Sequence, residues 1–224
     1  MVTQAELLKI DTIIFDFDGT LHKGDILSLP IFHECLQALY NEFQIDLKYP
    51  SDEIILSQFG KQADDIYPSL LKTTDLQIIS TFEKCVEEAE VQAFNDGKGE
   101  LYPNVDSTLT TLKNRKYRLA LCTNARVDYF EAAVENFNLG KYFDEMMAAG
   151  HNPGKNKTWM VCKIVEKLKS KRFAVVGDRF HDIQAAKNNG GIAIGCEYGF
   201  GKTEVKEADL QITHFEELLA IFQR

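Results

Sequence analysis

Ile13-Ile14-Phe15-Asp16-Phe17-Asp18-Gly19-Thr20 is an apolar run that ends abruptly in two carboxylates, a glycine and a hydroxyl. The apolar half predicts a buried strand of a parallel sheet. Residues two apart on an extended backbone point to the same side, so we expect Asp16 and Asp18 to face one cleft. Gly19 permits a tight turn, and the hydroxyl and amide of Thr20 can then bind the loop or an anion. An ordinary strand followed by an Asp-Gly hairpin turn remains the alternative at this point.

The composition is that of a folded domain with a negative charge. The 224 residues are 45% hydrophobic, which suffices for a buried core and allows one large domain or a core with a modest insertion. The formal net charge of -9 opposes long-range attraction to nucleic acid or to an anionic membrane, so we expect neither partner. An anionic substrate therefore needs a local positive site.

The cysteines are scattered, with an odd total of five and no CxxC pair: Cys35, Cys85, Cys122, Cys162 and Cys196. This pattern predicts reduced thiols rather than disulfides or a zinc site, and so favours the cytoplasm. The N-terminus lacks the basic start and apolar region of a signal peptide, and no apolar run is long enough to cross a bilayer. We therefore expect a cytoplasmic protein without membrane contact, and the sequence leaves its oligomeric state undetermined.

Residues 23–97 differ in character from the rest of the chain, because apolar residues recur at helical spacing and strand signals nearly vanish. The spacing predicts four helices, over 27–43, 52–58 with Ser51 as N-cap, 63–71 with a break near Pro68, and 75–94. Polar, glycine-containing segments flank the region as Lys23-Gly24-Asp25 and Asn95-Asp96-Gly97-Lys98-Gly99. We interpret 23–97 as an all-helical insertion on two movable linkers, with ordinary surface loops as the alternative to linkers.

From Leu101 onward, helices and strands alternate, which implies a parallel sheet covered by helices on both faces. We therefore predict an α/β core of residues 1–22 and 98–224 with a doubly wound parallel sheet. Ligands of such sheets bind outside the carboxyl ends of the strands. Polar residues gather at these ends: Thr123-Asn124 after a strand at 118–122, Lys155 in the loop before a helix at 158–168, and Gly177-Asp178 with Asp182 after a strand at 173–176.

Four motifs in this order resemble those of the haloacid dehalogenase (HAD) superfamily of hydrolases, chiefly its phosphatases. They are Asp16-Phe17-Asp18-Gly19-Thr20, Thr123-Asn124, Gly154-Lys155-Asn156-Lys157 and Gly177-Asp178-Arg179-Phe180-His181-Asp182. The resemblance covers nearly the whole core and implies the superfamily's Rossmann-like fold. The helical insertion resembles the first type of cap of that superfamily, as in phosphoglycolate phosphatases and β-phosphoglucomutases. In the family, this cap closes over the site and selects the substrate.

The charges of these residues favour a magnesium-dependent phosphatase. A phosphate dianion about 4 Å from a carboxylate is repelled by roughly 8 kcal/mol at an effective dielectric near 20, so a cation is needed. We expect Mg2+ to be held by Asp16, the backbone carbonyl of Asp18, and Asp178. Asp182 is expected to bind the metal directly or through another ligand. Lys155 would supply the second positive charge.

The same residues can be given roles in the hydrolysis of a phosphate monoester. Asp16 attacks phosphorus and forms an aspartyl phosphate, while Asp18 protonates the leaving alcohol and then deprotonates the attacking water. Thr123 binds the oxygens that gain charge, and Lys155, Asn124 and Thr20 bind the phosphate with it. The expected substrate is a small phosphorylated metabolite enclosed by the helical insertion.

Several alternatives remain. Lys157 lies two residues from Lys155 and can also reach a phosphate, and His22, His151 and His181 lie near the cleft. A phosphomutase would use the same machinery to pass the phosphoryl group to a second hydroxyl. A phospho-receiving signalling module also uses aspartates, lysine and magnesium, but its phosphorylated aspartate follows an earlier acidic pair. Dehalogenation is disfavoured, because that branch of the family lacks an acid at the place of Asp18.

Overall fold

The computed structural model describes residues 2–45, 48–61 and 63–223, and its centre is a six-stranded sheet. The strand order is β3-β2-β1-β4-β5-β6, and every neighbouring pair runs parallel. The strands are β1 (Thr12–Phe15), β2 (Arg118–Thr123), β3 (Glu145–Ala148), β4 (Phe173–Gly177), β5 (Ile192–Cys196) and β6 (Leu210–Ile212). The predicted parallel sheet is confirmed, and its first strand lies inside it between β2 and β4.

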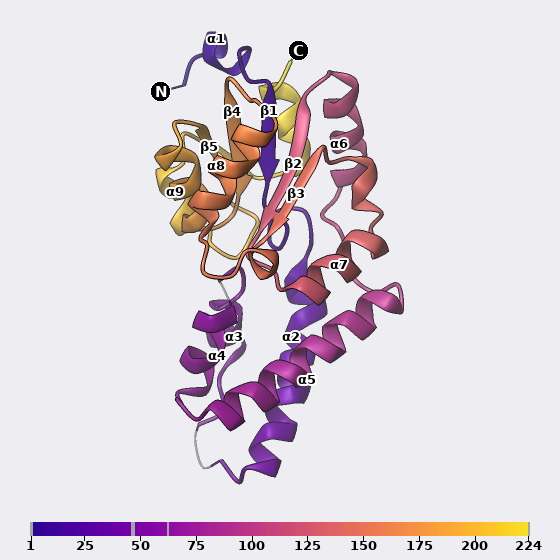
Figure 1. The fold of residues 1–224 in the computed structure, drawn as a ribbon, viewed down its shortest axis with the longest axis vertical. Helices are drawn as coiled ribbons and strands as arrows, with labels where there is room; N and C mark the ends of the chain where they lie inside the picture. The colour runs from indigo at the N-terminus through magenta and orange to yellow at the C-terminus, as the bar shows by residue number, and fades with distance from the viewer. Residues whose placement is uncertain (1, 46–47, 62, 224) are drawn as a thin grey trace.

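The side chains of β1 alternate between two buried faces. Ile13 and Phe15 pack in one apolar cluster, whereas Ile14 between them packs in another. The first face is covered by α6 (Val105–Asn114), α7 (Val127–Asn136) and α10 (Leu218–Ile221), and the second by α8 (Lys157–Lys167) and α9 (Phe180–Asn188) (Figure 1). Because both faces are covered, the strand is apolar at every position rather than at every second one. The predicted doubly wound arrangement is confirmed.

Short helical elements complete the core. They are α1 (Gln4–Leu7) and the 3-10 turns η1 (Leu139–Lys141), η2 (Ala149–His151), η3 (Glu204–Glu207) and η4 (Phe215–Glu217). None of the described helices is both long and apolar enough to span a membrane.

The described part of residues 24–95 is helical and contains no strand; we call it the helical insert. It consists of α2 (Gly24–Glu42), α3 (Asp52–Leu56), α4 (Ala63–Leu71) and α5 (Leu76–Asn95). Its apolar side chains form a separate core around Phe32, Leu36 and Phe82. Figure 1 shows the insert beyond the carboxyl end of β1, at the opposite end of the molecule from both termini. This places it over the edge of the sheet where ligands of α/β folds bind.

The expected break near Pro68 does not occur, because α4 continues through that residue. A proline inside a helix removes one backbone hydrogen bond and usually kinks the helix. Here Tyr67, Leu70 and Leu71 on either side are all buried in the core of the insert. Their burial on one face keeps the segment helical despite the lost bond.

The prediction of five reduced thiols is wrong for two of them, because Cys35 in α2 and Cys85 in α5 form a disulfide. These residues are 50 positions apart in the sequence, and they meet because α2 and α5 pack together in the insert. Cys122, Cys162 and Cys196 are free. The thiol pattern therefore gives no argument for a reducing compartment.

The two segments that connect the insert to the core lie side by side. The Lys23 amide donates to the Glu100 carbonyl oxygen at 2.8 Å, and their side chains form an ion pair. His22 pairs with Leu101 in an isolated antiparallel bridge, and the Tyr102 amide donates to Leu21. The chain thus leaves and re-enters the core at one place.

Candidate active site

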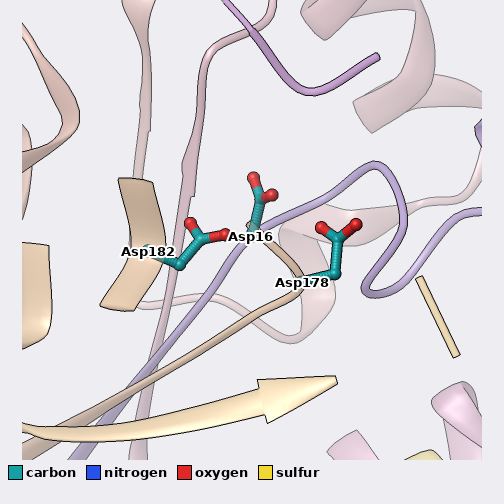
Figure 2. Close-up of side chains that lie close together, drawn as sticks. All are labelled: Asp16, Asp178 and Asp182. Atoms are coloured by element: carbon teal, nitrogen blue, oxygen red, sulfur yellow. The ribbon is translucent and has the colours of Figure 1, made fainter. Parts of the chain in front are cut away.

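Asp16 lies immediately after β1, at the carboxyl edge of the sheet, and its side chain is buried. Its amide donates to the Val176 carbonyl oxygen of β4 at 2.9 Å, which continues the strand pairing by one residue. Asp178 follows β4 directly, and Asp182 lies in the first turn of α9. Figure 2 shows the three carboxyl groups gathered at one place, those of Asp16 and Asp178 from the two strand ends and that of Asp182 from α9. Oxygen atoms of all three lie within 4.8 Å of one another.

Asp178 is fully buried, and only one of its oxygens has a donor. The Phe200 amide donates to Oδ2 at 2.6 Å, whereas Oδ1 has no hydrogen-bond partner among the described residues. Glycines make room for this carboxylate. A Cβ on Gly19, whose φ is +79°, would lie 2.4 Å from Asp178 Oδ2, and one on Gly199 would lie 2.3 Å from Asp178 Cβ. The glycine of the first motif is therefore required by its turn and by the close approach of Asp178.

Asp182 has two contacts that fix its orientation. Its Oδ2 accepts from the Arg179 amide at 3.0 Å, at the N-terminus of α9 where free amides favour a carboxylate. Its Oδ1 accepts from Lys157 Nζ at 2.7 Å. Asp182 thus both caps the N-terminus of α9 and forms an ion pair with Lys157.

Lys157, and not Lys155, lies against the carboxylates, which departs from the expectation. Lys157 Nζ is 2.7 Å from both Asp16 Oδ1 and Asp182 Oδ1, and its side chain is buried. Asn156 caps α8 by accepting from the Trp159 amide, so Lys157 is the first helical residue. Lys155 lies before the cap in the loop, and its Nζ is 5.4 Å from the Trp159 ring centroid. The position of the helix start decides which lysine points inward.

The carboxylates outnumber the cations at this place. Burial raises the pKa of Asp16 to about 7, with Asp182 adding to the rise and Lys157 opposing it. Burial also raises the pKa of Asp178 well above its ordinary value, helped by Asp16 and Asp182. Burial by itself lowers the pKa of Lys157, but the negative charges of Asp16 and Asp182 have the larger effect. The pKa of Lys157 is therefore raised.

A hard divalent cation fits this donor set. Magnesium prefers oxygen ligands and is usually held by one or two carboxylates. Asp16 and Asp178 supply carboxylate oxygens, and the Oδ1 atom of Asp178 is buried without a partner. Unpaired buried carboxylates are costly, so a cation is the group that this geometry lacks. The side chain of Asp18 is not one of the three clustered carboxylates.

The Asp18 side chain is instead held by two aromatic residues. Its Oδ1 accepts from the Tyr129 hydroxyl at 2.7 Å and lies 2.8 Å from His22 Nδ1. The sequence predicts His22 near the cleft but does not single out Tyr129. In the sequence Tyr129 looks like an apolar-face residue of α7, and nothing in the local pattern distinguishes it from a core residue.

The residues of the second motif line the cavity. Thr123 is buried at the end of β2, and its Oγ1 accepts from the Ala125 amide at 3.2 Å, which leaves its hydroxyl hydrogen available. Asn124 Nδ2 donates to the Gly60 carbonyl oxygen of the insert at 2.9 Å. Thr20 does not line the cavity; its carbonyl oxygen accepts from the Tyr198 hydroxyl at 3.0 Å. The structure thus brings Thr123 and Asn124 to the site but not Thr20.

The cavity has a volume of about 90 Å³ and lies between the sheet edge and the helical insert. The core supplies Asp16, Asp18 and Thr123, and the insert supplies Ser28, Phe59 and Glu90 among others. His151 and His181 do not line it. The cavity is therefore bounded by both the core and the insert.

A second buried acidic group lies on the insert side of the cavity. Glu90 accepts from Ser28 Oγ at 2.6 Å and from Arg126 at 3.0 Å, and Arg126 also donates to the Tyr67 hydroxyl. Burial raises the pKa of Glu90 to about 7, whereas Arg126 opposes that rise. Sequence reasoning missed Glu90 and Arg126, because a charged residue in an amphipathic helix is normally exposed. It also missed Arg179, which donates to the Phe59 carbonyl oxygen of the insert.

Comparison with known proteins gives consistent relatives. The sequence model of the haloacid dehalogenase-like hydrolases matches residues 13–195. A phosphoglycolate phosphatase of Pasteurella multocida is 29% identical over 205 residues, covering 87% of this chain and 88% of that protein. The crystal structure of a predicted phosphoglycolate phosphatase from Haemophilus somnus has a TM-score of 0.80 at 23% identity, with 100% of both chains covered. CbbY from Rhodobacter sphaeroides in complex with phosphate has a TM-score of 0.78 at 21% identity, covering 96% of this chain and 100% of that one.

The solved structures share the fold, and the family match spans the strands that carry the clustered carboxylates. The resemblance drawn from the four motifs is therefore confirmed by an independent comparison. The chain belongs to the haloacid dehalogenase-like hydrolases and is a phosphatase of that superfamily.

Proposed function

We propose that the protein hydrolyses the phosphate monoester of a small metabolite with Mg2+, through a phosphate ester of Asp16. The observation that carries this proposal is the buried excess of carboxylate over cation at the sheet edge, with Asp16 at its centre. Asp16 and Asp178, with the backbone carbonyl of Asp18, would hold the magnesium ion. When bound, the ion offsets the charge repulsion between the phosphate and the carboxylates and orients the phosphoryl group.

Asp16 is the nucleophile of this proposal. Lys157 binds its Oδ1, so Oδ2 is the oxygen left to attack phosphorus. Attack forms the bond between Asp16 Oδ2 and phosphorus and breaks the bond from phosphorus to the leaving oxygen. Water then attacks phosphorus, releases inorganic phosphate and restores the Asp16 carboxylate.

Asp18 moves the protons in both halves of the reaction. It gives a proton to the leaving alcohol and later takes one from the attacking water. Asp18 lines the cavity beside Asp16, and its side chain is 19% exposed, so it can reach a bound substrate. Its carboxylate lies outside the cluster of Asp16, Asp178 and Asp182, so it can transfer protons.

Thr123 and Lys157 bind the phosphate oxygens in this proposal. The Thr123 hydroxyl hydrogen is available, because its oxygen accepts the local backbone bond. Lys157 replaces Lys155 in the role of phosphate-binding lysine, because it is the lysine that contacts Asp16. Asn124 contributes through its backbone, since its side-chain amide is bound to Gly60, and Thr20 supports the turn.

Residues 23–97 would act as the cap over a core of 1–22 and 98–224. Two core side chains, those of Asn124 and Arg179, donate to adjacent carbonyl oxygens of the insert, on Gly60 and Phe59. These bonds favour a closed arrangement that excludes bulk water and admits only small substrates. Phosphoglycolate, named for the relatives, is a first compound to assay.

A cytoplasmic location remains part of the proposal, on the ground of the substrate class. Separation of cells into cytoplasmic, membrane and extracellular fractions tests it: recovery of the protein in the cytoplasmic fraction supports this location, and recovery outside that fraction contradicts it.

The direct test is to trap the phosphorylated enzyme. Wild type incubated with Mg2+ and 4-nitrophenyl phosphate, then quenched in acid, should carry one phosphate on the peptide that contains Asp16. With a hexose phosphate as the substrate, inorganic phosphate should be the product rather than an isomer of that sugar phosphate. Release of inorganic phosphate at an unchanged rate in Asp16→Asn, or full turnover in excess chelator, would reject the proposal.

A further inference from the structure

We propose that His22 and Tyr129 are positioning residues that orient the Asp18 carboxyl, so that one defined oxygen exchanges protons with the substrate and with water. This inference rests on the proposed function, because it assigns a role to groups that act through Asp18. It deepens that function by naming the residues that fix the geometry of proton transfer.

Both residues contact the same oxygen of Asp18. Tyr129 Oη lies 2.7 Å and His22 Nδ1 lies 2.8 Å from Asp18 Oδ1. Two donors on one oxygen occupy the lone pairs of Oδ1 and fix the plane of the carboxyl group. Among the described residues no donor contacts Oδ2. Oδ2 is therefore the oxygen that holds and releases the proton.

The surroundings of His22 make its Nδ1 the protonated nitrogen. The imidazole is fully buried and stacks on Phe17, with ring centroids 5.1 Å apart, and it contacts Phe94 and Phe137. Nε2 is buried with no hydrogen-bond partner among the described residues. A proton on Nε2 would point into this aromatic box unsatisfied, whereas a proton on Nδ1 is bound by Asp18.

Tyr129 is also held in the donor state. Its side chain is buried, and burial raises the pKa of its phenol well above the ordinary value, with Asp18 and Glu90 adding to the rise. The hydroxyl therefore keeps its proton and donates a hydrogen bond to Asp18 Oδ1. Tyr129 comes from α7 and His22 from the segment after β1, so two separate parts of the core fix the carboxyl.

The backbone of His22 is fixed as firmly as its ring. Its amide donates to the Phe17 carbonyl oxygen at 3.0 Å, and its carbonyl oxygen accepts from the Gly19 amide at 2.9 Å. Gly99 from the returning connection leaves room for the ring, because a Cβ there would lie 3.2 Å from His22 Nε2. A side chain placed this precisely beside the acid is suited to orient it.

The proton balance follows from this arrangement. As the bond from phosphorus to the leaving oxygen breaks, the proton on Asp18 Oδ2 moves to that oxygen. When water attacks the Asp16 phosphate, one of its protons returns to Asp18 Oδ2. His22 and Tyr129 keep their own protons throughout.

The experiment compares kcat/KM for a good and a poor leaving group. This ratio covers only the steps up to phosphoryl transfer to Asp16, so it isolates protonation of the leaving group. The substrates are 4-nitrophenyl phosphate, whose leaving group needs little protonation, and glycerol phosphate, whose alkoxide needs it fully. The variants are Tyr129→Phe, His22→Leu and His22→Asn, whose amide nitrogen can replace Nδ1, with Asp18→Asn as reference. Phe137→Leu is the control, because it loosens the same aromatic box without removing a bond to Asp18.

We expect Tyr129→Phe and His22→Leu to lower kcat/KM for glycerol phosphate roughly tenfold to a hundredfold, the effect of one hydrogen bond to a charged group. For both variants, the fold loss of kcat/KM should be at least fivefold smaller with 4-nitrophenyl phosphate than with glycerol phosphate. Asp18→Asn should show the same difference between the two substrates. His22→Asn should recover most of the His22→Leu loss, and Phe137→Leu should affect both substrates equally.

The outcomes distinguish the positioning role of His22 and Tyr129 from the proton-carrying role of Asp18. A leaving-group dependence in Asp18→Asn that is absent from both Tyr129→Phe and His22→Leu overturns the inference and leaves the proposed function standing. An Asp18→Asn variant that loses equal activity on both substrates overturns the proton-carrying role of Asp18, and the inference with it.

Discussion

Two buried polar clusters reach the same cavity, one through Asp16 and the other through Glu90, and they differ in how their carboxylates are paired. The core cluster contains Asp16, Asp178 and Asp182, and among the described residues Lys157 is the cation that forms ion pairs with them. The interface cluster contains Glu90 with Arg126, and Ser28 and Tyr67 complete its hydrogen bonds. Both clusters are buried, and burial raises the carboxyl pKa in each. Burial by itself therefore does not mark the reactive site.

The difference is that both carboxylate oxygens of Glu90 have a hydrogen-bond donor, whereas Asp178 Oδ1 in the core cluster has none among the described residues. A buried ion pair with its hydrogen bonds satisfied is a structural feature of an interface. A buried carboxylate with an unpaired oxygen, such as Asp178, needs a cation from outside. Variants of both clusters test this contrast.

Asp16→Asn should lower kcat by at least about ten-thousandfold, because the amide cannot act as the nucleophile. The variant should still fold, and circular dichroism with thermal unfolding checks this. Assays with 4-nitrophenyl phosphate and Mg2+ give the rate. Glu90→Gln is the matched control from the interface cluster, and its rate on the same substrate should fall far less. Equal losses in the two variants would erase the distinction between the clusters.

Arg126→Met should destabilise the protein by about 4 kcal/mol, because it leaves Glu90 buried without its cation. Adding Glu90→Gln to Arg126→Met should restore much of that stability, since the uncompensated charge is removed with its partner. Urea unfolding of the two single variants and the double variant measures the coupling. Additive losses would show that Arg126 and Glu90 do not compensate each other.

Lys157→Ala should lower kcat/KM about a hundredfold, because one charge that stabilises the phosphoryl group is lost. Lys155→Ala should leave kcat/KM within about threefold of the wild type, since Lys155 Nζ lies over the Trp159 ring, whereas Lys157 Nζ is the one paired with Asp16 and Asp182. The two variants differ at lysines only two residues apart in the chain. A larger loss in Lys155→Ala than in Lys157→Ala would reverse the assignment made from the geometry.

The stability difference between wild type and Glu90→Gln should depend on pH. Burial raises the Glu90 pKa from 4.5 to about 7 in the folded state, so the unfolded chain releases this proton first as pH rises. The folded state of the wild type therefore loses stability relative to Glu90→Gln between about pH 4.5 and 7, by about 2 kcal/mol. Urea unfolding of both proteins at pH 4.5, 5.5, 6.5 and 7.5 measures it. A difference that grows in favour of the wild type as pH rises would contradict the raised pKa.

Much of the sheet could be predicted because its signals are local. Apolar runs such as Ile13-Ile14-Phe15, followed at once by polar residues, mark the carboxyl ends of buried parallel strands. The same signals placed Asp16, Asp178 and Asp182 at one edge, and the structure brings them together. The expected roles of these residues remain proposals.

The remaining features depend on contacts between distant segments. Choosing Lys157 over Lys155 requires knowing that Asn156 caps the helix, and a shift of two residues reverses the choice. Tyr129 and Glu90 occupy ordinary helical positions, and only the packing of helices against the site gives them polar partners. The Cys35–Cys85 disulfide follows from the pairing of α2 and α5, which no sequence spacing indicates.

The most direct test of the central claim is the thermal unfolding of three proteins with and without Mg2+ at pH 7.5. A ligand that binds only the folded state stabilises it by about 2.7 kcal/mol at 100 times its dissociation constant. We expect Mg2+ to raise the Tm of the wild type and the Tm of Glu90→Gln by the same amount. The Tm of Asp178→Asn should not change when Mg2+ is added. Without metal, Asp178→Asn should be more stable than the wild type, because one uncompensated carboxylate is gone. An equal Mg2+ shift in Asp178→Asn and the wild type, or no shift in the wild type, would contradict a metal site at the core cluster.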